Sequence, residues 1–198
     1  VTLAALLSEM TDPLHLARFP EPYYRGLLAS STDRSASTPA EKEGWFKNED
    51  LDNYVREEPR EGRIEYVMLD AEGPGAITRI WSANPQGTLR IYIDGAKTPV
   101  LEADMEALLS GRVEPFTAPF AYTAARGRNL YFPFPYAKSC KITMDSKGAF
   151  YQVNYRSYAP GASVNSYTPI DLERNSKTIA DTAVALRRSP KPASGTPG

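Results

Sequence analysis

The chain lacks most of the residues on which disulfides and metal sites depend. Its 198 residues include one cysteine, Cys140, and one histidine, His15. A single cysteine forms no intrachain disulfide. One His and one Cys far apart in the sequence do not make a zinc site or a Cys–His catalytic pair. We therefore expect no metal, and we predict that Cys140 is a small buried strand residue and that His15 is structural or solvated.

Charge of one sign and long apolar runs are also missing. The 23 basic and 24 acidic side chains give a net charge of −1, which leaves no electrostatic footprint for nucleic acid. No run of about 18 apolar residues exists, so we predict no membrane span. Gly73-Pro74-Gly75 lacks the lysine spacing and the following helix of a phosphate loop. It predicts a tight β turn, and no cofactor is expected.

The most informative segment that is present runs from Gly62 to Gly95. It contains three stretches, Arg63 to Asp70, Ile77 to Trp81 and Leu89 to Ile93, in which apolar residues alternate with others. Turns rich in Pro and Gly separate them. Period-two alternation bounded by such turns indicates half-buried antiparallel strands.

Further strands are predicted after this block. They are Pro99 to Glu102, Asn129 to Phe134, Cys140 to Asp145 and Phe150 to Tyr158. Antiparallel strands with one buried face pack as a sandwich or barrel. We predict an all-β fold, an antiparallel jelly-roll-like β-sandwich of about eight strands, with a short N-terminal helix and a C-terminal helix.

Two strands carry additional signals. Gln152, Asn154 and Arg156 alternate with Tyr151 and Val153, so one face of that strand is polar. Pro133 and Pro135 place the stretch NLYFPFPY at an edge or an end, because proline donates nothing to a ladder. Trp81, within a strand, is expected in the core or just beneath a binding site.

Helical spacing is confined to the two ends of the chain and one short turn. Leu3, Leu6, Leu7 and Met10 predict a helix from Thr2 to Met10, Met105 to Leu109 predict one turn, and Asp171 to Arg188 predict the longest helix. We divide the chain into an N-terminal helical segment (1–16), a jelly-roll domain with its C-terminal helix (17–188), and a flexible linker or tail (189–198) rich in Pro, Ser and Gly.

The long polar segment from Leu28 to Asn53 holds the candidate chemistry. Trp45 and Phe46 in its middle argue against disorder, because such residues seek a pocket or a partner. Ser31 to Arg34 reads either as a turn with an Asp–Arg pair or as a polar group that binds sugar hydroxyls. Glu49, Asp50 and Asp52 read either as a solvated acidic face or as glycosidase carboxylates. Catalytic residues stay unassigned.

Several blocks in constant order resemble a known family. They are SSTDR at Ser30 to Arg34, GWFKNED at Gly44 to Asp50, the segment from Glu65 to Gly95, NLYFPFPYAKSCKITMD from Asn129, and YQVNYRSY from Tyr151. Together they resemble the N-terminal jelly-roll half of a domain-of-unknown-function family grouped with glycoside hydrolase family 172. The resemblance covers roughly residues 17 to 186.

The resemblance implies two tandem jelly rolls that cleave or rearrange furanosides with retention, without a metal. It implies that the catalytic glutamates belong to a later part of the chain than residues 1–198. It carries five positions over as sugar-binding: Asp33, Arg34, Trp45, Asn48 and Asp50. The segment SASTPAEKE replaces the family's usual glycine-rich stretch after Asp-Arg, which alters the route of the loop.

We predict the N-terminal domain of a furanoside-directed glycoside hydrolase, inactive without a second jelly-roll half. The rival is a non-catalytic carbohydrate-binding or assembly protein of a shell or filament, since jelly rolls serve in all these ways. Carbohydrate and a homo-oligomer, trimer or hexamer, or a second jelly-roll half are the expected partners. A processed N-terminus is suspected at Val1, so we expect a secreted or periplasmic protein.

Overall fold

Two antiparallel β-sheets pack face to face in the computed structural model, which describes residues 1–34, 40 and 49–188. The six-stranded sheet contains β1 (Tyr24–Ser30), β4 (Gly75–Ser82), β7 (Ala121–Ala124), β8 (Gly127–Leu130), β9 (Phe134–Tyr136) and β11 (Tyr151–Tyr158). The five-stranded sheet contains β2 (Arg56–Arg60), β3 (Arg63–Glu72), β5 (Thr88–Ile93), β6 (Leu101–Asp104) and β10 (Ser139–Met144). The helical elements are α1 (Leu3–Glu9), the 3-10 helix η1 (Pro13–Ala17), α3 (Met105–Leu109), α4 (Ile170–Arg174) and α5 (Ser176–Arg187).

The strand order is that of a jelly roll. It is β1-β11-β4-β8-β7 in the six-stranded sheet, where β9 also pairs with β4, and β2-β3-β10-β5-β6 in the other. The chain crosses between the sheets from β3 to β4 to β5, and again from β9 to β10 to β11, so the last strands insert between the first ones. All of these pairings are antiparallel. The predicted antiparallel β-sandwich with terminal helices is confirmed.

The core lies between the two sheets and follows the period-two pattern of the strands. On β10, Cys140, Ile142 and Met144 are fully buried, and they pair with Ile93, Ile91 and Leu89 of β5. Rings from the connections around β7, β8 and β9 complete the core, and Phe132 meets Phe116 edge-on at 5.1 Å between centroids. The predicted burial of Cys140 is therefore confirmed.

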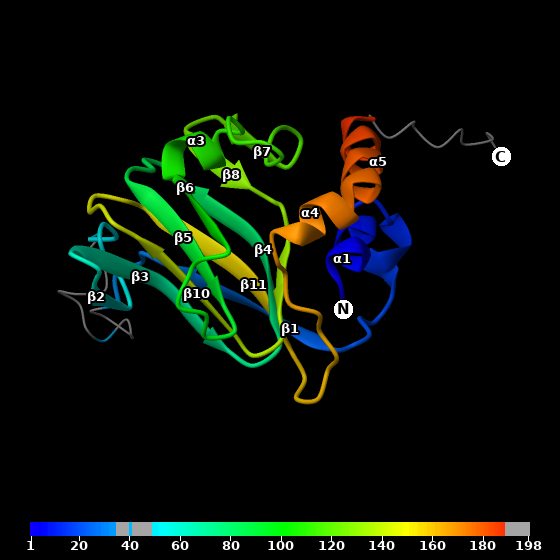
Figure 1. Cartoon of the computed structure of the whole chain (residues 1–198), viewed down its shortest axis with the longest axis horizontal. Helices are drawn as coiled ribbons and strands as arrows, with labels where there is room; N and C mark the ends of the chain where they lie inside the picture. Colours follow the sequence, from blue (N-terminus) through cyan, green and yellow to red (C-terminus); the bar gives the residue numbers. More distant parts are fainter. Residues whose placement is uncertain (35–39, 41–48, 189–198) are drawn as a thin grey trace.

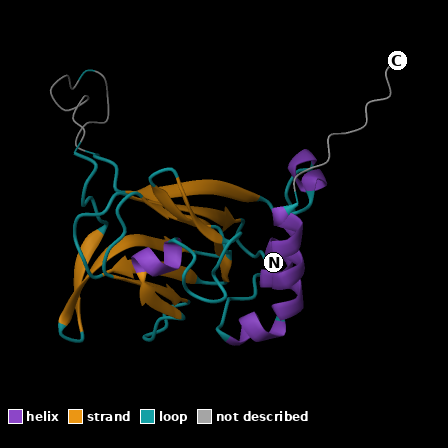
Figure 2. Ribbon diagram, turned by 90° about the horizontal axis from the view of Figure 1, so that it is seen from above, coloured by secondary structure: helices purple, strands orange, loops and turns teal. Residues whose placement is uncertain are grey.

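The terminal helices lie together on the outer side of the six-stranded sheet (Figures 1 and 2). Leu6 of α1 packs with Ala76, Tyr158 and Val164 in a second small core on that outer surface. The Thr182 hydroxyl of α5 donates to the Leu7 carbonyl of α1 at 3.5 Å. Leu3 and Leu7 reach the main core. One end of the sheet's outer surface is thus covered by helices.

Three strands were not predicted. β1 has the sequence YRGLLAS, which does not alternate, and its last three residues belong to the long polar segment that begins at Leu28. β2, REEPR, is almost entirely charged and contains a proline, as is typical of an edge strand. β7 lies in a Pro- and Ala-rich stretch for which no strand was predicted. Pairing with a neighbouring strand, rather than local pattern, makes these segments strands.

Two predicted elements are divided in the structure. The stretch Asn129 to Phe134 breaks between Leu130 and Phe134, and its two parts, β8 and β9, pair with opposite halves of β4. Pro133 lies in the break and has no N–H for a ladder. The C-terminal helix breaks at Asn175. Its predicted apolar stripe packs on the core nonetheless, and it consists of Leu172, Ile179, Ala183 and Leu186.

The remaining features are the C-terminal tail, membrane-spanning helices and metal-binding groups. The predicted tail, 189–198, lies outside the described residues. Within the described part of the chain, no helix is long and apolar enough to cross a membrane. The same part contains no group of three His, Cys, Asp or Glu side chains that could hold a metal ion.

Candidate functional site

Three of the five predicted sugar-binding residues meet at the base of the loop that follows β1. The Asp50 carboxylate accepts a hydrogen bond from the Asp33 backbone N–H at 2.7 Å and one from the Thr32 hydroxyl at 3.5 Å. The Arg34 guanidinium donates to the carbonyls of Ser30 at 2.6 Å and Thr32 at 3.2 Å. Asp33, Arg34 and Asp50 therefore lie together at the base of the loop. Trp45 and Asn48 lie outside the described residues.

A second set of bonds fastens this loop base to the sandwich. The Asn53 side-chain amide donates to the carbonyls of Ser31 at 2.9 Å and Glu49 at 2.6 Å. The Tyr151 N–H of β11 donates to the Ser31 hydroxyl at 3.1 Å. Burial raises the pKa of Tyr151 to about 12, and the nearby Arg34 charge offsets part of that rise. The two ends of the loop are thus held together on the edge of the six-stranded sheet.

The Asp52 carboxylate takes a structural position next to the loop base. It accepts hydrogen bonds from the Gly148 N–H at 2.5 Å and from the Tyr54 hydroxyl at 2.8 Å. Asp50 is likewise bonded to a backbone N–H of the loop. These contacts make Asp50 and Asp52 turn-forming carboxylates in the described part of the chain, and their role toward a sugar stays a prediction.

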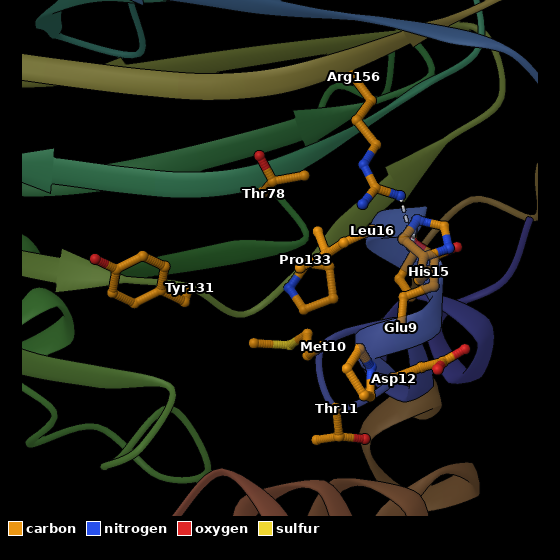
Figure 3. Close-up of a pocket in the computed structure, with 12 residues that line it drawn as sticks. Glu9, Met10, Thr11, Asp12, His15, Leu16, Thr78, Tyr131, Pro133 and Arg156 are labelled. Carbon is orange, nitrogen blue, oxygen red and sulfur yellow. Dashed lines mark hydrogen bonds and ion pairs between the residues drawn. The ribbon is translucent and has the colours of Figure 1, made fainter. Parts of the chain in front are cut away.

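A cleft of about 590 Å³ opens between the six-stranded sheet and the N-terminal segment (Figure 3). Arg156 of β11 reaches across it and donates to the Glu9 carboxylate of α1 at 2.5 Å. His15 Nε2 lies 3.3 Å from the same carboxylate. Burial alone would lower the pKa of Arg156, but its hydrogen bonds with Tyr158 and Glu9 raise it. Thr78, Tyr131 and Pro133 line the side formed by the sheet.

The sheet surface beyond this cleft carries a cluster that we call the open face: Arg79, Trp81, Asn129, Gln152 and Asn154. The strand register places all five on the outer side, because Trp81 of β4 pairs with Gln152 of β11 and with Asn129 of β8, and Arg79 pairs with Asn154. Ser30, which begins the loop base, is the partner of Gln152 on β1. The open face therefore adjoins the predicted sugar-binding loop.

Arg79 is the centre of the open face. Its guanidinium donates to the side-chain oxygens of Asn129 at 3.1 and 3.2 Å, Gln152 at 3.0 Å and Asn154 at 3.3 Å. It lies 5.9 Å from the Trp81 ring centroid and 5.8 Å from that of Tyr131. An arginine side chain held by three amides and two rings is pre-organised for contact with a ligand.

Sequence reasoning found only part of this surface. The polar face of β11 was predicted, and it supplies Gln152, Asn154 and Arg156. Of the two positions expected for Trp81, the core is excluded, because its indole is half buried on the outer surface. Arg79 and Glu9 were missed, since only the fold brings β4, β8, β11 and α1 together.

Rings and apolar side chains form a second hollow beside the open face. Tyr131 and Tyr122 stack at 5.7 Å between centroids. They line a cavity of about 490 Å³ together with Met10, Pro119 and Leu186. Tyr131 belongs to the walls of both cavities. Hollows of this size suit a small organic ligand.

Fold and surface define a jelly-roll domain with polar and aromatic side chains exposed on one sheet. Residues 22–175 match the family model described as the GH172 first beta-sandwich domain. The chain therefore belongs to glycoside hydrolase family 172, and it corresponds to the first β-sandwich domain of that family. A search of curated proteins returned no match.

Proposed function

We propose that this chain is the sugar-binding first sandwich of a furanoside-directed glycosidase, which acts together with a further sandwich that supplies the catalytic glutamates. The observation that carries the proposal is the family match over residues 22–175, whose description names a first sandwich. The loop base supports it, because Asp33, Arg34 and Asp50 meet at one edge of the sheet.

The described carboxyl groups with a shifted pKa have structural partners. A glycosidase needs a pair of carboxyl groups, one of them with a raised pKa. Among the described residues, the carboxyl groups whose pKa shifts are Glu58, Glu65, Asp94 and Asp145, and each is held below its ordinary value by neighbouring donors. These four carboxyl groups are therefore satisfied within the fold, and the proposal takes its catalytic glutamates from the further sandwich.

The test is a titration of the full chain with methyl α-D-arabinofuranoside, with methyl α-D-mannopyranoside as the pyranoside control. We expect the furanoside to bind and Trp45→Ala to weaken that binding by roughly 1–3 kcal/mol, by analogy with base–aromatic stacking. The melting temperature should barely change. Tyr23→Ala, which removes a ring that is 60% exposed just before β1, is the matched control.

Two results would count against the proposal. Equal binding of both sugars would remove the furanoside preference. If Trp45→Ala unfolds the protein while affinity stays intact, Trp45 anchors the loop and the sugar-binding assignment is wrong.

The second candidate is a non-catalytic assembly module, and one observation favours it. Leu16 and Phe19 are 90% and 92% exposed on the N-terminal segment, and exposed apolar residues of this kind mark interaction surfaces. Light scattering tests this self-assembly. A trimer or hexamer supports self-assembly, whereas a monomer of 21.9 kDa removes it.

A further inference from the structure

Arg79 differs from other half-buried arginines of this protein in what neutralises its charge. Arg63, Arg90, Arg128 and Arg156 each lie within 4 Å of a carboxylate, with side-chain exposures between 6% and 31%. Arg79 has no carboxylate within that distance in the described part of the chain. Burying a cation is costly unless it is paired, and amide dipoles compensate a full charge only in part.

Hydrogen bonding to the Arg79 guanidinium fixes the orientation of the side-chain amides around it. A guanidinium has donors and no acceptor, so the side-chain oxygens of Asn129, Gln152 and Asn154 must face it. The NH₂ groups therefore point away. That of Asn129 donates to the Gly127 carbonyl at 3.3 Å. Those of Gln152 and Asn154 have no partner among the described residues, and they remain available to a ligand.

The donors of the open face thus outnumber its free acceptors. The hydrogen bonds of Arg79 use one hydrogen of Nη2, and the other has no acceptor among the described residues. Together with the amides of Gln152 and Asn154, it forms a set of donors around one positive charge. Such a set suits a carboxylate, whose oxygens accept several hydrogen bonds.

The rings beside Arg79 indicate what carries the carboxylate. Trp81 and Tyr131 flank the guanidinium, and Tyr122 extends the aromatic surface along the 490 Å³ hollow. Flat rings of Trp and Tyr offer an apolar body with a polar edge, which suits the face of a sugar ring. A free inorganic anion has no apolar face that could pack against these rings.

We propose that the open face binds a glycuronic acid residue of a glycan, with its carboxylate on Arg79, Gln152 and Asn154 and its ring against Tyr131 and Tyr122. This site is separate from the furanoside contacts proposed for the loop. Among the described residues, Arg60 also lacks a carboxylate within 4 Å, but it shares its hollow with Asp70, so negative charge is already present there.

The experiment is an NMR titration of the full chain with methyl β-D-glucuronide and with methyl β-D-glucoside, which differ only in the carboxylate. We expect the glucuronide to bind about tenfold tighter or more, because its carboxylate forms a charge-assisted hydrogen bond with Arg79. The preference should shrink as salt rises. Arg79→Gln should abolish the preference, and Gln152→Ala should reduce it with Arg79 in place.

Arg112→Gln is the matched control, because Arg112 is an exposed arginine that does not belong to the open face and pairs with Glu106. It should leave the preference unchanged. If Arg79→Gln does not fold, the wild-type preference and Gln152→Ala decide. Equal affinity for the two glycosides, a preference that survives Arg79→Gln, or competition by sodium acetate as strong as by the glucuronide would each overturn the proposal.

Different substitutions test the furanoside contacts of the loop and the acidic-sugar site of the open face. Trp45→Ala should weaken the arabinofuranoside and spare the glucuronide, and Arg79→Gln should do the reverse. If one substitution weakens both ligands equally in a folded protein, the open face and the loop are one site, and the separate acidic-sugar site is wrong.

Discussion

The outer surfaces of the two sheets use charge in opposite ways. On the five-stranded sheet, Glu65 is fully buried and receives hydrogen bonds from Arg63, Tyr92 and Thr143 at 2.9 to 3.0 Å. On the six-stranded sheet, Arg79 is held by amides alone. On the first surface, the network around Glu65 satisfies its own charges. The second keeps donors and rings available, which is what a binding surface requires.

Neighbouring pairs extend the satisfied network across the five-stranded sheet. Lys141 pairs with Glu58 at 2.6 Å, and Arg90 pairs with Asp145 at 2.9 Å. Burial alone would raise the pKa of Glu65, but Arg63, Tyr92 and Thr143 hold it below its ordinary value. We therefore assign this surface to stability and the opposite one to binding.

The largest effect is expected where the satisfied network is broken. Glu65→Gln removes a buried charge and leaves the buried Arg90 and the partly buried Arg63 with less compensation. We expect a loss of about 3–5 kcal/mol in the free energy of unfolding, measured by urea denaturation. Sugar binding by the folded fraction should not change.

Glu61→Gln provides the control for this change. Glu61 is 73% exposed and also pairs with Arg63, at 3.4 Å. Its removal should change the free energy of unfolding by less than about 0.5 kcal/mol. A similar loss in both variants would show that the network around Glu65 has no special role.

Acid should dismantle the same network. The pKa values of Glu65 and Glu58 are lowered in the folded protein, so the unfolded chain binds protons more readily. Their stabilisation is fully present above the ordinary carboxylate range, about pH 4–5, and is lost as pH falls through the lowered pKa values. Urea midpoints from pH 7 to pH 3 measure this loss, and the slope should be shallower in Glu65→Gln.

Sequence reasoning predicted most strands of the sandwich but not the network around Glu65. Alternation predicted β3, β4, β5, β10 and β11 and therefore the sandwich. It gave no reason for Glu65 of β3 to be buried. That burial depends on Tyr92 and Thr143 from two other strands, and pairing across a sheet is not encoded in local spacing.

The next effect concerns the position of the Trp81 ring on the open face. A Cβ on Gly127 would lie 2.1 Å from Trp81 Nε1, so Gly127→Ala must displace the indole. We expect a loss of about 1–3 kcal/mol in stability and a shifted indole N–H resonance. Gly26→Ala, with open space around its Cβ, is the control. An unmoved indole in Gly127→Ala would contradict the described packing.

The smallest effect is expected from the exposed end of the aromatic surface. Tyr122 is 39% exposed and stacks on Tyr131. Tyr122→Ala should cost about 0.5–1.5 kcal/mol of stability or less, as for a single aromatic pair. Glucuronide affinity should fall a few-fold while the preference over the glucoside persists, because the carboxylate contacts remain. Loss of that preference would mean that Arg79 depends on the Tyr122 ring.

The most direct test of the contrast between the two surfaces is to map both sugars on the folded protein by ¹H–¹⁵N NMR. We predict that methyl β-D-glucuronide shifts the Trp81 indole and the side-chain amides of Gln152 and Asn154. Methyl α-D-arabinofuranoside should shift the backbone around Asp33 and Asp50. The amides of Tyr92 and Thr143 should stay unmoved by either sugar. Shifts centred on Tyr92 and Thr143, with none on the open face or the loop base, would contradict the account.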